Sequence, residues 1–513
     1  MRTIERGGRR SRVQRCAAPI AVTVALLALV ACSSSSDAAK SATTTTTASS
    51  PTTTKTRPAG PAAELSTELP NAEAAFLGEG TKPDLAKVGY VQREYIVSGT
   101  ATSYKTDALT ADGRWTYTPD TTAPYRTRIL VRAPAKASKF SGNVMLEWLN
   151  VSGGADANPE WVSTAEEIER SGDVWVGVSA QRIGVEGGPV LVKVEGVPGA
   201  ENQGKGMKAI DPARYGTLEH PGDGYAFDIF SQVARAVRAG GAMNGPKPKQ
   251  VLAGGESQSA FALVTYYNGV QPLTQAFDGF FIHSRGAVGI PLVGPGKSAD
   301  IAGAISGTAT IFRTDQGAPV LDIQTETDVA SILNSYAARQ PDTARFRLWE
   351  VAGTAHADKH LLGAGVQYID CGVPVNDGPM HIVAKAAWHD LKAWIETGKT
   401  PVVAPRITVT PGATLAVERN GDAIALGGIR TPPVDVPVAA VSGQAGPNPT
   451  TICLLLGSTK PFDAARIAEL YPSRAAYLKA YNANADKTIK AGFVLPADRA
   501  ALLAFANPST VQG

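Results

Sequence analysis

The sequence predicts an α/β protein built on a mostly parallel sheet with helices on its faces. Several short stretches have the pattern of strands, and the later ones are continuously apolar and rich in Val, Leu and Phe, as in strands buried on both faces. Amphipathic stretches, clearest at 224–239 and 259–267, lie between them, and this alternation favours a parallel sheet. The expected strands are 90–98, 125–132, 143–149, 174–179, 250–254, 277–283, 319–323 and 345–351.

Two regions extend beyond this repeating pattern. Residues 182–222 are rich in Gly, Pro and Lys with weak periodicity, so we expect an insertion over one edge of the sheet. After a helix expected at 379–397, residues 399–513 form a C-terminal elaboration, with β-like pieces at 401–437 and helical patterns at 461–482 and 496–506. Because no Ser/Gly-rich linker sets this region apart, we expect 63–513 to form one domain.

The N-terminal residues account for the basic character of the chain. Of 513 residues, with a formal net charge of +3, residues 1–31 carry six Arg and one Glu, which is +5. Subtracting +5 from +3 leaves −2 for the rest. A body this close to neutral lacks the basic surface that binds nucleic acid, so we expect no nucleic-acid partner.

The same residues predict export. The apolar run 17–31 is shorter than the roughly 20 residues that span a membrane, and it follows an Arg-rich start, which is typical of a secretory signal peptide. It ends in Leu-Val-Ala-Cys32, which resembles the bacterial lipobox. The resemblance implies cleavage before Cys32 and acylation of this residue, which would anchor the protein to a membrane it does not span. The alternative is an ordinary signal peptide in which Cys32 is incidental.

A tether and a disulfide are expected after the signal. In residues 33–54, 15 side chains are Ser or Thr, so we expect residues 32–62 to form a disordered tether. Cys16 is removed with the leader and Cys32 takes lipid, which leaves Cys371 and Cys453. Two thiols in an oxidising compartment favour one disulfide, and the alternative is two buried free thiols.

The most informative segment is an apolar strand that runs into Gly255-Glu256-Ser257-Gln258-Ser259 and then into an apolar helix. A serine on a tight strand-to-helix turn exposes its Oγ, and small flanking residues allow the helix to approach closely. The pattern resembles the nucleophile elbow of α/β-hydrolases, with Ser259 where the usual last glycine stands. The alternative is that Ser257 only caps the helix.

A serine nucleophile needs a base, and the base needs an orienting acid. His356 follows the last expected strand in a loop of small residues, and Asp328 and Glu326 follow the strand before it. Asp328 is the favoured acid by its spacing from that strand, and Glu326 is the alternative. The order Ser, acid, His is that of the α/β-hydrolase triad, and each residue follows the carboxyl end of a strand, where open α/β sheets place their sites.

Two further histidines, His283 and His360, are candidates for a base or for a metal ligand. His283 ends an expected strand and is a competing base. His356 and His360 form an HxxxH pair, but zinc proteases have Glu after the first His, and Ala357 stands there. We therefore expect no metal and no organic cofactor.

An oxyanion formed at this serine would need two backbone N–H donors. One is expected from Gln258, which follows the nucleophile. The other is expected from Val151 or Ser152, in the Gly-rich loop after the third strand.

The chain as a whole resembles the secreted bacterial α/β-hydrolase domain proteins, a branch of the serine esterases. The resemblance covers residues from about 70 to the C-terminus and implies eight core strands, a Ser–acid–His triad and ester hydrolysis, without implying a substrate. The segments that carry it are 146–154, 177–181, 255–259, 324–328 and 353–356.

The sequence therefore predicts a lipid-anchored, extracytoplasmic serine hydrolase that cleaves small carboxylic esters. Two alternatives stay open. One is a binding lipoprotein that uses the hydrolase sheet as a scaffold. The other is a peptidase or amidase, because the same triad serves both reactions.

Overall fold

The computed structural model describes residues 57–512 apart from 198, 243–246, 413–414 and 449. The predicted signal peptide, Cys32 and the tether up to residue 56 lie outside the described residues. From Arg57 on, the chain contacts the domain: Arg57 pairs with Asp278, and Arg235 donates to the Pro61 carbonyl at 3.1 Å. Among the described residues, contacts with the domain thus already occur at residue 57, six residues before the boundary predicted at 63.

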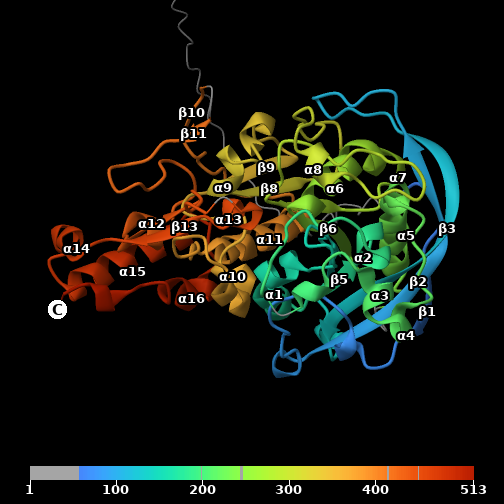
Figure 1. Cartoon of the computed structure of the whole chain (residues 1–513), viewed down its shortest axis with the longest axis horizontal. Coiled ribbons are helices and arrows are strands. Elements are labelled where there is room, and N and C mark those ends of the chain that lie inside the picture. Colours follow the sequence, from blue (N-terminus) through green and yellow to red (C-terminus); the bar gives the residue numbers. More distant parts are fainter. Residues whose placement is uncertain (1–56, 198, 243–246, 413–414, 449, 513) are drawn as a thin grey trace, which may run out of the picture. The chain divides into compact units, whose positions relative to one another are not determined.

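Within the described residues, nine strands form one sheet in the order β1-β2-β3-β5-β4-β6-β7-β8-β9 (Figure 1). From β5 to β9 in this order all pairings are parallel, whereas β1, β2, β3 and β5 pair antiparallel. This confirms the predicted mostly parallel α/β fold. The strands are β1 (Glu64–Glu68), β2 (Tyr90–Lys105), β3 (Thr118–Pro134), β4 (Asn143–Trp148), β5 (Val174–Val178), β6 (Gln250–Glu256), β7 (Gly279–His283), β8 (Val320–Thr325) and β9 (Phe346–Val351).

The antiparallel end of the sheet differs most from expectation. The ninth strand, β1, was not predicted, and β2 and β3 are each much longer than expected. They pair as one ribbon from Tyr90 opposite Pro134 to Lys105 opposite Thr118. Most of the first seven residues of β3 are exposed and polar, so this part of β3 has no apolar pattern to predict a strand, although Ala101 and Tyr104 of the paired β2 join the core.

Helices cover both faces of the sheet. They are α1 (Pro159–Ser171), α2 (Arg182–Glu186), α3 (Gly206–Ile210), α4 (Pro212–Tyr215), α5 (Ala226–Arg238), α6 (Gln258–Thr265), α7 (Gln271–Thr274), α8 (Ile301–Ala304), α9 (Glu326–Ala330), α10 (Lys359–Leu362), α11 (Met380–Thr397), α12 (Pro432–Asp435), α13 (Thr451–Leu455), α14 (Ala464–Leu470), α15 (Arg474–Lys490) and α16 (Arg499–Leu503). Helices α5 and α6 bury one face, and α1 and α11 bury the other. Neighbouring residues of one strand enter different cores, as Phe280 and Phe281 do, because successive strand side chains point to opposite faces.

The region 182–222 follows the interior strand β5 and forms the short helices α2, α3 and α4. Val185, Met207 and Tyr215 pack with Ile96 of β2. The backbone N–H groups of residues 191 and 192 donate to the carbonyl of Ser152, each at 2.9 Å. This region thus lies on β2 and on the loop after β4, because its apolar residues are buried there.

The C-terminal elaboration contains two small sheets, β10 (Val409–Thr410) with β11 (Ala416–Val417), and β12 (Ala439–Ser442) with β13 (Ser458–Pro461). The helical pattern expected at 461–482 is divided at Pro472 into α14 and α15, because proline cannot continue a helix from the preceding turn. Ser473 caps α15 by accepting from the N–H of Ala476. Ala485 and Leu502 join the core under α11, so the elaboration packs on the sheet domain.

A disulfide joins Cys371 and Cys453, 82 residues apart, as the sequence predicted.

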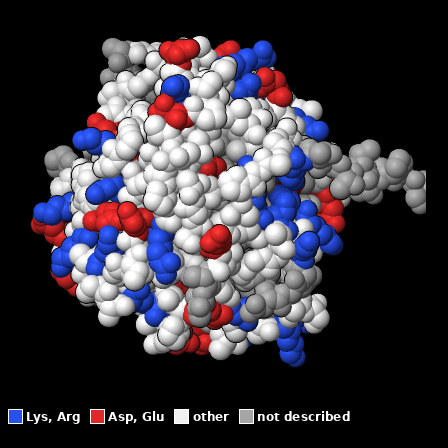
Figure 2. Space-filling model, turned by 90° about the vertical axis from the view of Figure 1, so that its right-hand side faces the viewer, with Lys and Arg blue, Asp and Glu red and all other residues white. Residues whose placement is uncertain are grey.

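On the face drawn in Figure 2, which is the right-hand side of Figure 1 near β2, β3 and α7, acidic and basic side chains surround a largely uncharged centre. Among the helices that the structure describes, none is both long and apolar enough to cross a membrane.

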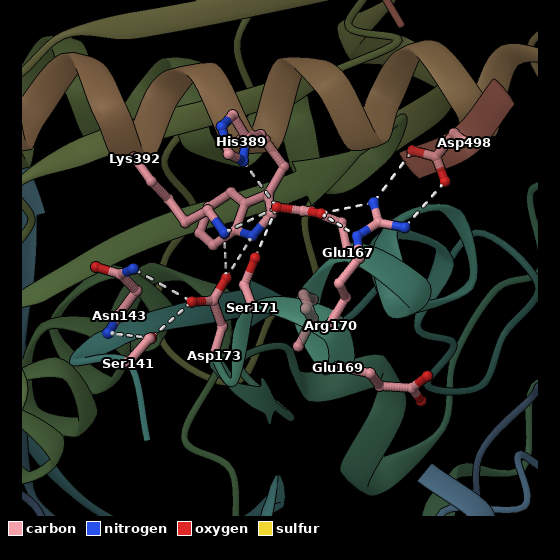
Figure 3. A network of polar contacts seen from close by, with 12 residues as sticks. Ser141, Asn143, Glu167, Glu169, Arg170, Ser171, Asp173, His389, Lys392 and Asp498 are labelled. Atoms are coloured by element: carbon pink, nitrogen blue, oxygen red, sulfur yellow. Dashed lines mark hydrogen bonds and ion pairs between the residues drawn. The ribbon is translucent and has the colours of Figure 1, made fainter. Parts of the chain in front are cut away.

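A polar network joins α1 to α11 and to the chain just before α16 (Figure 3). Glu167 accepts from Nδ1 of His389 at 2.9 Å and from Arg170 at 2.7 Å, and Arg170 also pairs with Asp498. Burial raises the pKa of Glu167, but the hydrogen bond from His389 and the charge of Lys392 outweigh it and lower this pKa to about 2. The network therefore stabilises the packing of the C-terminal region through an ionised carboxylate.

We predict that this network makes stability depend on pH in the acid range. Because the pKa of Glu167 is lowered from 4.5 to about 2 on folding, its stabilisation is present above pH 4.5 and is lost as pH falls towards 2. Thermal melts of wild type and Glu167→Gln between pH 2 and 7 should differ by a few degrees at pH 6 and converge near pH 2. A gap of constant size across this range would contradict the prediction.

Candidate active site

Ser257 lies in the turn between β6 and α6 in a strained backbone conformation, with φ 58° and ψ −123°. Its N–H donates to the carbonyl of His283 in the adjacent strand β7 at 2.9 Å, which helps to hold the turn. A Cβ on Gly255 would lie 3.0 Å from the Cβ of Ser259 and 3.1 Å from Leu263. The close approach of α6 to β6 therefore requires glycine at 255, and the serine at 259 is small enough to be accommodated.

The structure brings Ser257, His356 and Asp328 into one hydrogen-bonded chain. His356 Nε2 lies 2.8 Å from Ser257 Oγ, and His356 Nδ1 lies 2.7 Å from Asp328 Oδ1. The other carboxylate oxygen of Asp328 accepts from the N–H of Thr325 at 2.7 Å, and the Thr325 hydroxyl accepts from the Asp328 N–H. This reciprocal cap of α9 fixes the carboxylate with Oδ1 facing the imidazole.

Electrostatics favour an ionised Asp328 beside His356. Burial alone would raise the pKa of Asp328, but the charge of His356 and hydrogen bonds from His356 and Thr325 lower it. Burial alone would lower the pKa of His356, but the charge and hydrogen bond of Asp328 raise it. Because Asp328 accepts the Nδ1 proton, Nε2 is free to accept the hydroxyl proton of Ser257, which makes Oγ a nucleophile.

Glu326, the alternative acid, has other partners. Its carboxylate accepts from Arg419 at 2.6 Å, from the N–H of Gly353 at 2.8 Å and from the N–H of Gly443 at 2.9 Å. It is fully buried, and in the part of the chain that the structure describes it has no hydrogen bond or ion pair with His356. Glu326 therefore ties the loop that carries His356 to the C-terminal elaboration.

The backbone N–H groups expected to bind the oxyanion differ in whether they already have an acceptor. The Gln258 N–H begins α6, so it has no acceptor within the helix. The Val151 N–H donates to the side-chain Oε1 of Gln258 at 3.2 Å, and the Ser152 N–H donates to Asn150 Oδ1 at 2.8 Å. An oxyanion that uses Val151 must therefore replace the Gln258 side chain.

Two residues that the sequence argument gave no role support this loop. Asn150 Nδ2 donates to the carbonyl of Glu256 at 3.0 Å, which fastens the loop to the turn at Ser257. Gln181 Oε1 accepts from Gln258 Nε2 at 2.5 Å and from Trp148 Nε1 at 2.9 Å. Contacts between residues this far apart leave no spacing signal in the sequence.

The remaining histidines lie outside the hydrogen-bonded chain. The ring of His283 is buried, with Nδ1 3.5 Å from Glu160, and only its backbone carbonyl contacts Ser257. Nε2 of His360 forms a hydrogen bond with the Val162 carbonyl. The His360 ring stacks on the ring of His381, with 3.6 Å between the ring centroids. In the part of the chain that the structure describes, no group of three or more His, Cys, Asp or Glu could hold a metal ion.

A family model described as "Alpha/beta hydrolase domain" matches residues 50–504. Among solved structures, the chain is 14% identical to XC6422 of Xanthomonas campestris, an a/b serine hydrolase without lid, over 57% of this chain and 95% of that one, with a TM-score of 0.29. It is 11% identical to a fungal esterase of Rhizomucor miehei over 59% of this chain and 85% of that one, with a TM-score of 0.30. At such TM-scores these two likenesses carry no argument. No curated protein matches the chain.

We predict that the two carboxylates of α9 separate in their effects. Asp328→Asn should lower the pKa of His356, measured by NMR titration of the imidazole, because the neutral amide no longer stabilises the charged ring. Glu326→Gln should leave that pKa in place and cost roughly 2–4 kcal/mol of unfolding free energy, because Arg419 loses its buried partner. The reverse pattern would make Glu326 the orienting acid.

Proposed function

The chain belongs to the alpha/beta hydrolase domain family, and we propose that it is a serine hydrolase that cleaves carboxylic esters. The observation that supports this most is the chain of hydrogen bonds from Ser257 Oγ through His356 to Asp328, at 2.8 and 2.7 Å. The strained turn at Ser257 adds support. Strained backbone conformations persist only where the surrounding structure holds them, and they occur mainly at active sites.

In this proposal the reaction has two steps. Ser257 Oγ attacks the ester carbonyl while His356 takes its proton, and His356 then gives the proton to the leaving alcohol, which leaves an acyl-enzyme. Water, deprotonated by His356, attacks the acyl carbon, and the proton returns to Ser257 as the acid is released. Asp328 stabilises the imidazolium in both steps.

The oxyanion of each tetrahedral intermediate is stabilised by backbone N–H groups. Gln258 supplies its N–H at the start of α6, where the helix also favours negative charge. Val151 supplies the second donor once the carboxamide of Gln258 has moved away. Both steps use only groups of this chain, the substrate and water.

We predict that Ser257→Ala abolishes labelling by a fluorophosphonate probe and lowers hydrolysis of p-nitrophenyl esters by on the order of 10⁴-fold. His356→Ala should do the same, because Oγ then has no base. Ser259→Ala is the matched control. This serine lies two residues away, its buried hydroxyl has no hydrogen-bond partner among the described residues, and its loss should leave labelling unchanged.

Fluorophosphonate labelling and a comparison of ester with amide substrates also separate the proposed esterase from a binding protein and from a peptidase or amidase. A folded wild-type protein that is not labelled at Ser257 would favour a binding protein on a hydrolase scaffold. Faster turnover of p-nitroanilides than of matched p-nitrophenyl esters would favour a peptidase or amidase.

We further propose that the protein is exported and anchored by lipid on Cys32, which places the catalytic domain outside the cytoplasmic membrane. The signal-like residues 17–31 and the lipobox-like sequence before Cys32 support this. The disulfide between Cys371 and Cys453 adds support, because disulfides persist in oxidising compartments.

We predict that wild-type protein expressed in a bacterium partitions into the detergent phase and incorporates a labelled fatty acid. Cys32→Ala should be unlabelled and should move to the aqueous phase, because no acyl group is attached. Cys16→Ala is the control, since Cys16 lies in the leader. Equal lipid incorporation in Cys32→Ala and wild type would contradict the anchor.

A further inference from the structure

A small cavity beside His356 is lined by acids and histidines. Its volume is about 10 Å³, and its titratable lining residues are Glu256, His283, His356, Asp358, His360 and His381. A space of this size accommodates one water molecule at most. Solvent reaches the rim of this cavity, where His360 is exposed, but Glu256 and His356 are only 4% and 6% exposed, so their charges are screened weakly.

Glu256 is the lining residue closest to the nucleophile in sequence, since it ends β6 directly before Ser257. It is only 4% exposed and lies opposite His283 in the parallel register of β6 and β7. In the described part of the chain, its carboxylate has no hydrogen bond and no ion pair. It does line this cavity. A buried carboxylate without a bonded partner is costly, so its charge acts on whatever ionisable groups surround it.

The groups that face Glu256 differ in how readily they ionise. From α1, burial raises the pKa of Glu160 well above the ordinary value, which favours its protonated form. From β7, His283 stays neutral, because burial lowers its pKa. From α9, Asp328 is ionised, and its carboxylate is bonded to His356.

The cavity wall formed by α10 and α11 adds one titrating acid. Burial raises the pKa of Asp358 to about 7, but its Oδ1 accepts from the N–H of Leu361 as the cap of α10. Burial lowers the pKa of His360 and of His381, so both stay neutral near pH 7. The group left to carry positive charge in the cavity during the reaction is His356.

We propose that Glu256 is a second acid of the active site, whose ionised carboxylate stabilises the imidazolium of His356 across the cavity without bonding to it. Glu256 is thus a positioning residue in the electrostatic sense, because it acts through His356 and does not contact the reacting atoms. This inference rests on the proposed serine-hydrolase function and adds a pH dependence to it.

The pH dependence follows from two coupled titrations. Burial raises the pKa of Glu256 to about 7, against the lowering effect of His356 and His283. The charge of Glu256 in turn raises the pKa of His356, although by less than the charge and hydrogen bond of Asp328 do. Glu256 therefore ionises near pH 7, and its charge delays the loss of the His356 proton, so the rate of hydrolysis should rise over the pH range in which His356 becomes the free base.

The test compares pH–rate profiles of kcat/KM for p-nitrophenyl acetate in the full-length protein. In Glu256→Gln the ascending limb should move to lower pH, because no second anion holds the proton on His356. The plateau at alkaline pH should fall roughly tenfold, because the imidazolium formed in the reaction is less stabilised. Glu256→Asp keeps a carboxylate and should restore the limb towards wild type.

Asp358→Asn is the matched control, since it removes a carboxylate from the same cavity while asparagine still caps α10. Its limb should coincide with that of wild type. The rate of fluorophosphonate labelling against pH gives a second readout that does not depend on the ester, and thermal melts check that each variant is folded.

The outcomes separate the two proposals. An active, labelled wild type with an unchanged limb in folded Glu256→Gln overturns the role of Glu256 and leaves the serine hydrolase intact. Equal shifts in Glu256→Gln and Asp358→Asn also overturn it, because the total charge of the cavity would then set the profile. A folded wild type that neither labels nor hydrolyses esters overturns the proposed function itself.

Discussion

The turn at Ser257 is the constraint on which the rest of the site depends. A positive φ of 58° at a serine is unfavourable, and here the hydrogen bond to the His283 carbonyl and the close packing of α6 on β6 maintain it. That packing in turn requires Gly255 and a small side chain at 259. Because the turn is held by the centre of the parallel sheet, Oγ stands at the edge where β8 and β9 also deliver their loops.

The C-terminal elaboration contributes to this site without supplying any residue of the hydrogen-bonded chain. Gly443 and Arg419 both bond to Glu326, and Glu326 bonds to Gly353 in the loop that leads to His356. A Cβ on Gly353 would lie 2.4 Å from Val434, so this loop and the elaboration are in direct contact. The position of His356 therefore depends on residues up to 87 positions later in the chain, at Gly443.

The buried carboxylates of Asp328, Glu326 and Glu256 differ because their partners differ. Asp328 is bonded to the imidazole and to the N-terminus of α9, so it stays ionised. Glu326 is bonded to Arg419 and to backbone N–H groups, and it serves the architecture. Glu256 has the cavity alone, and its pKa of about 7 leaves its charge sensitive to pH in the working range of a hydrolase.

The sequence alone determined the fold class, the strands β4 to β9, and Ser257 and His356 as candidates, because apolar runs and small-residue turns are local signals. It did not reveal β1 or the full length of β2 and β3, because the pairing of these strands extends into residues without a regular apolar pattern. It favoured Asp328 but left Glu326 open, since both lie directly after β8, in the first turn of α9. Only the tertiary structure separated them, because partners distant in the chain, Arg419 for one and His356 for the other, decide which carboxylate meets the imidazole.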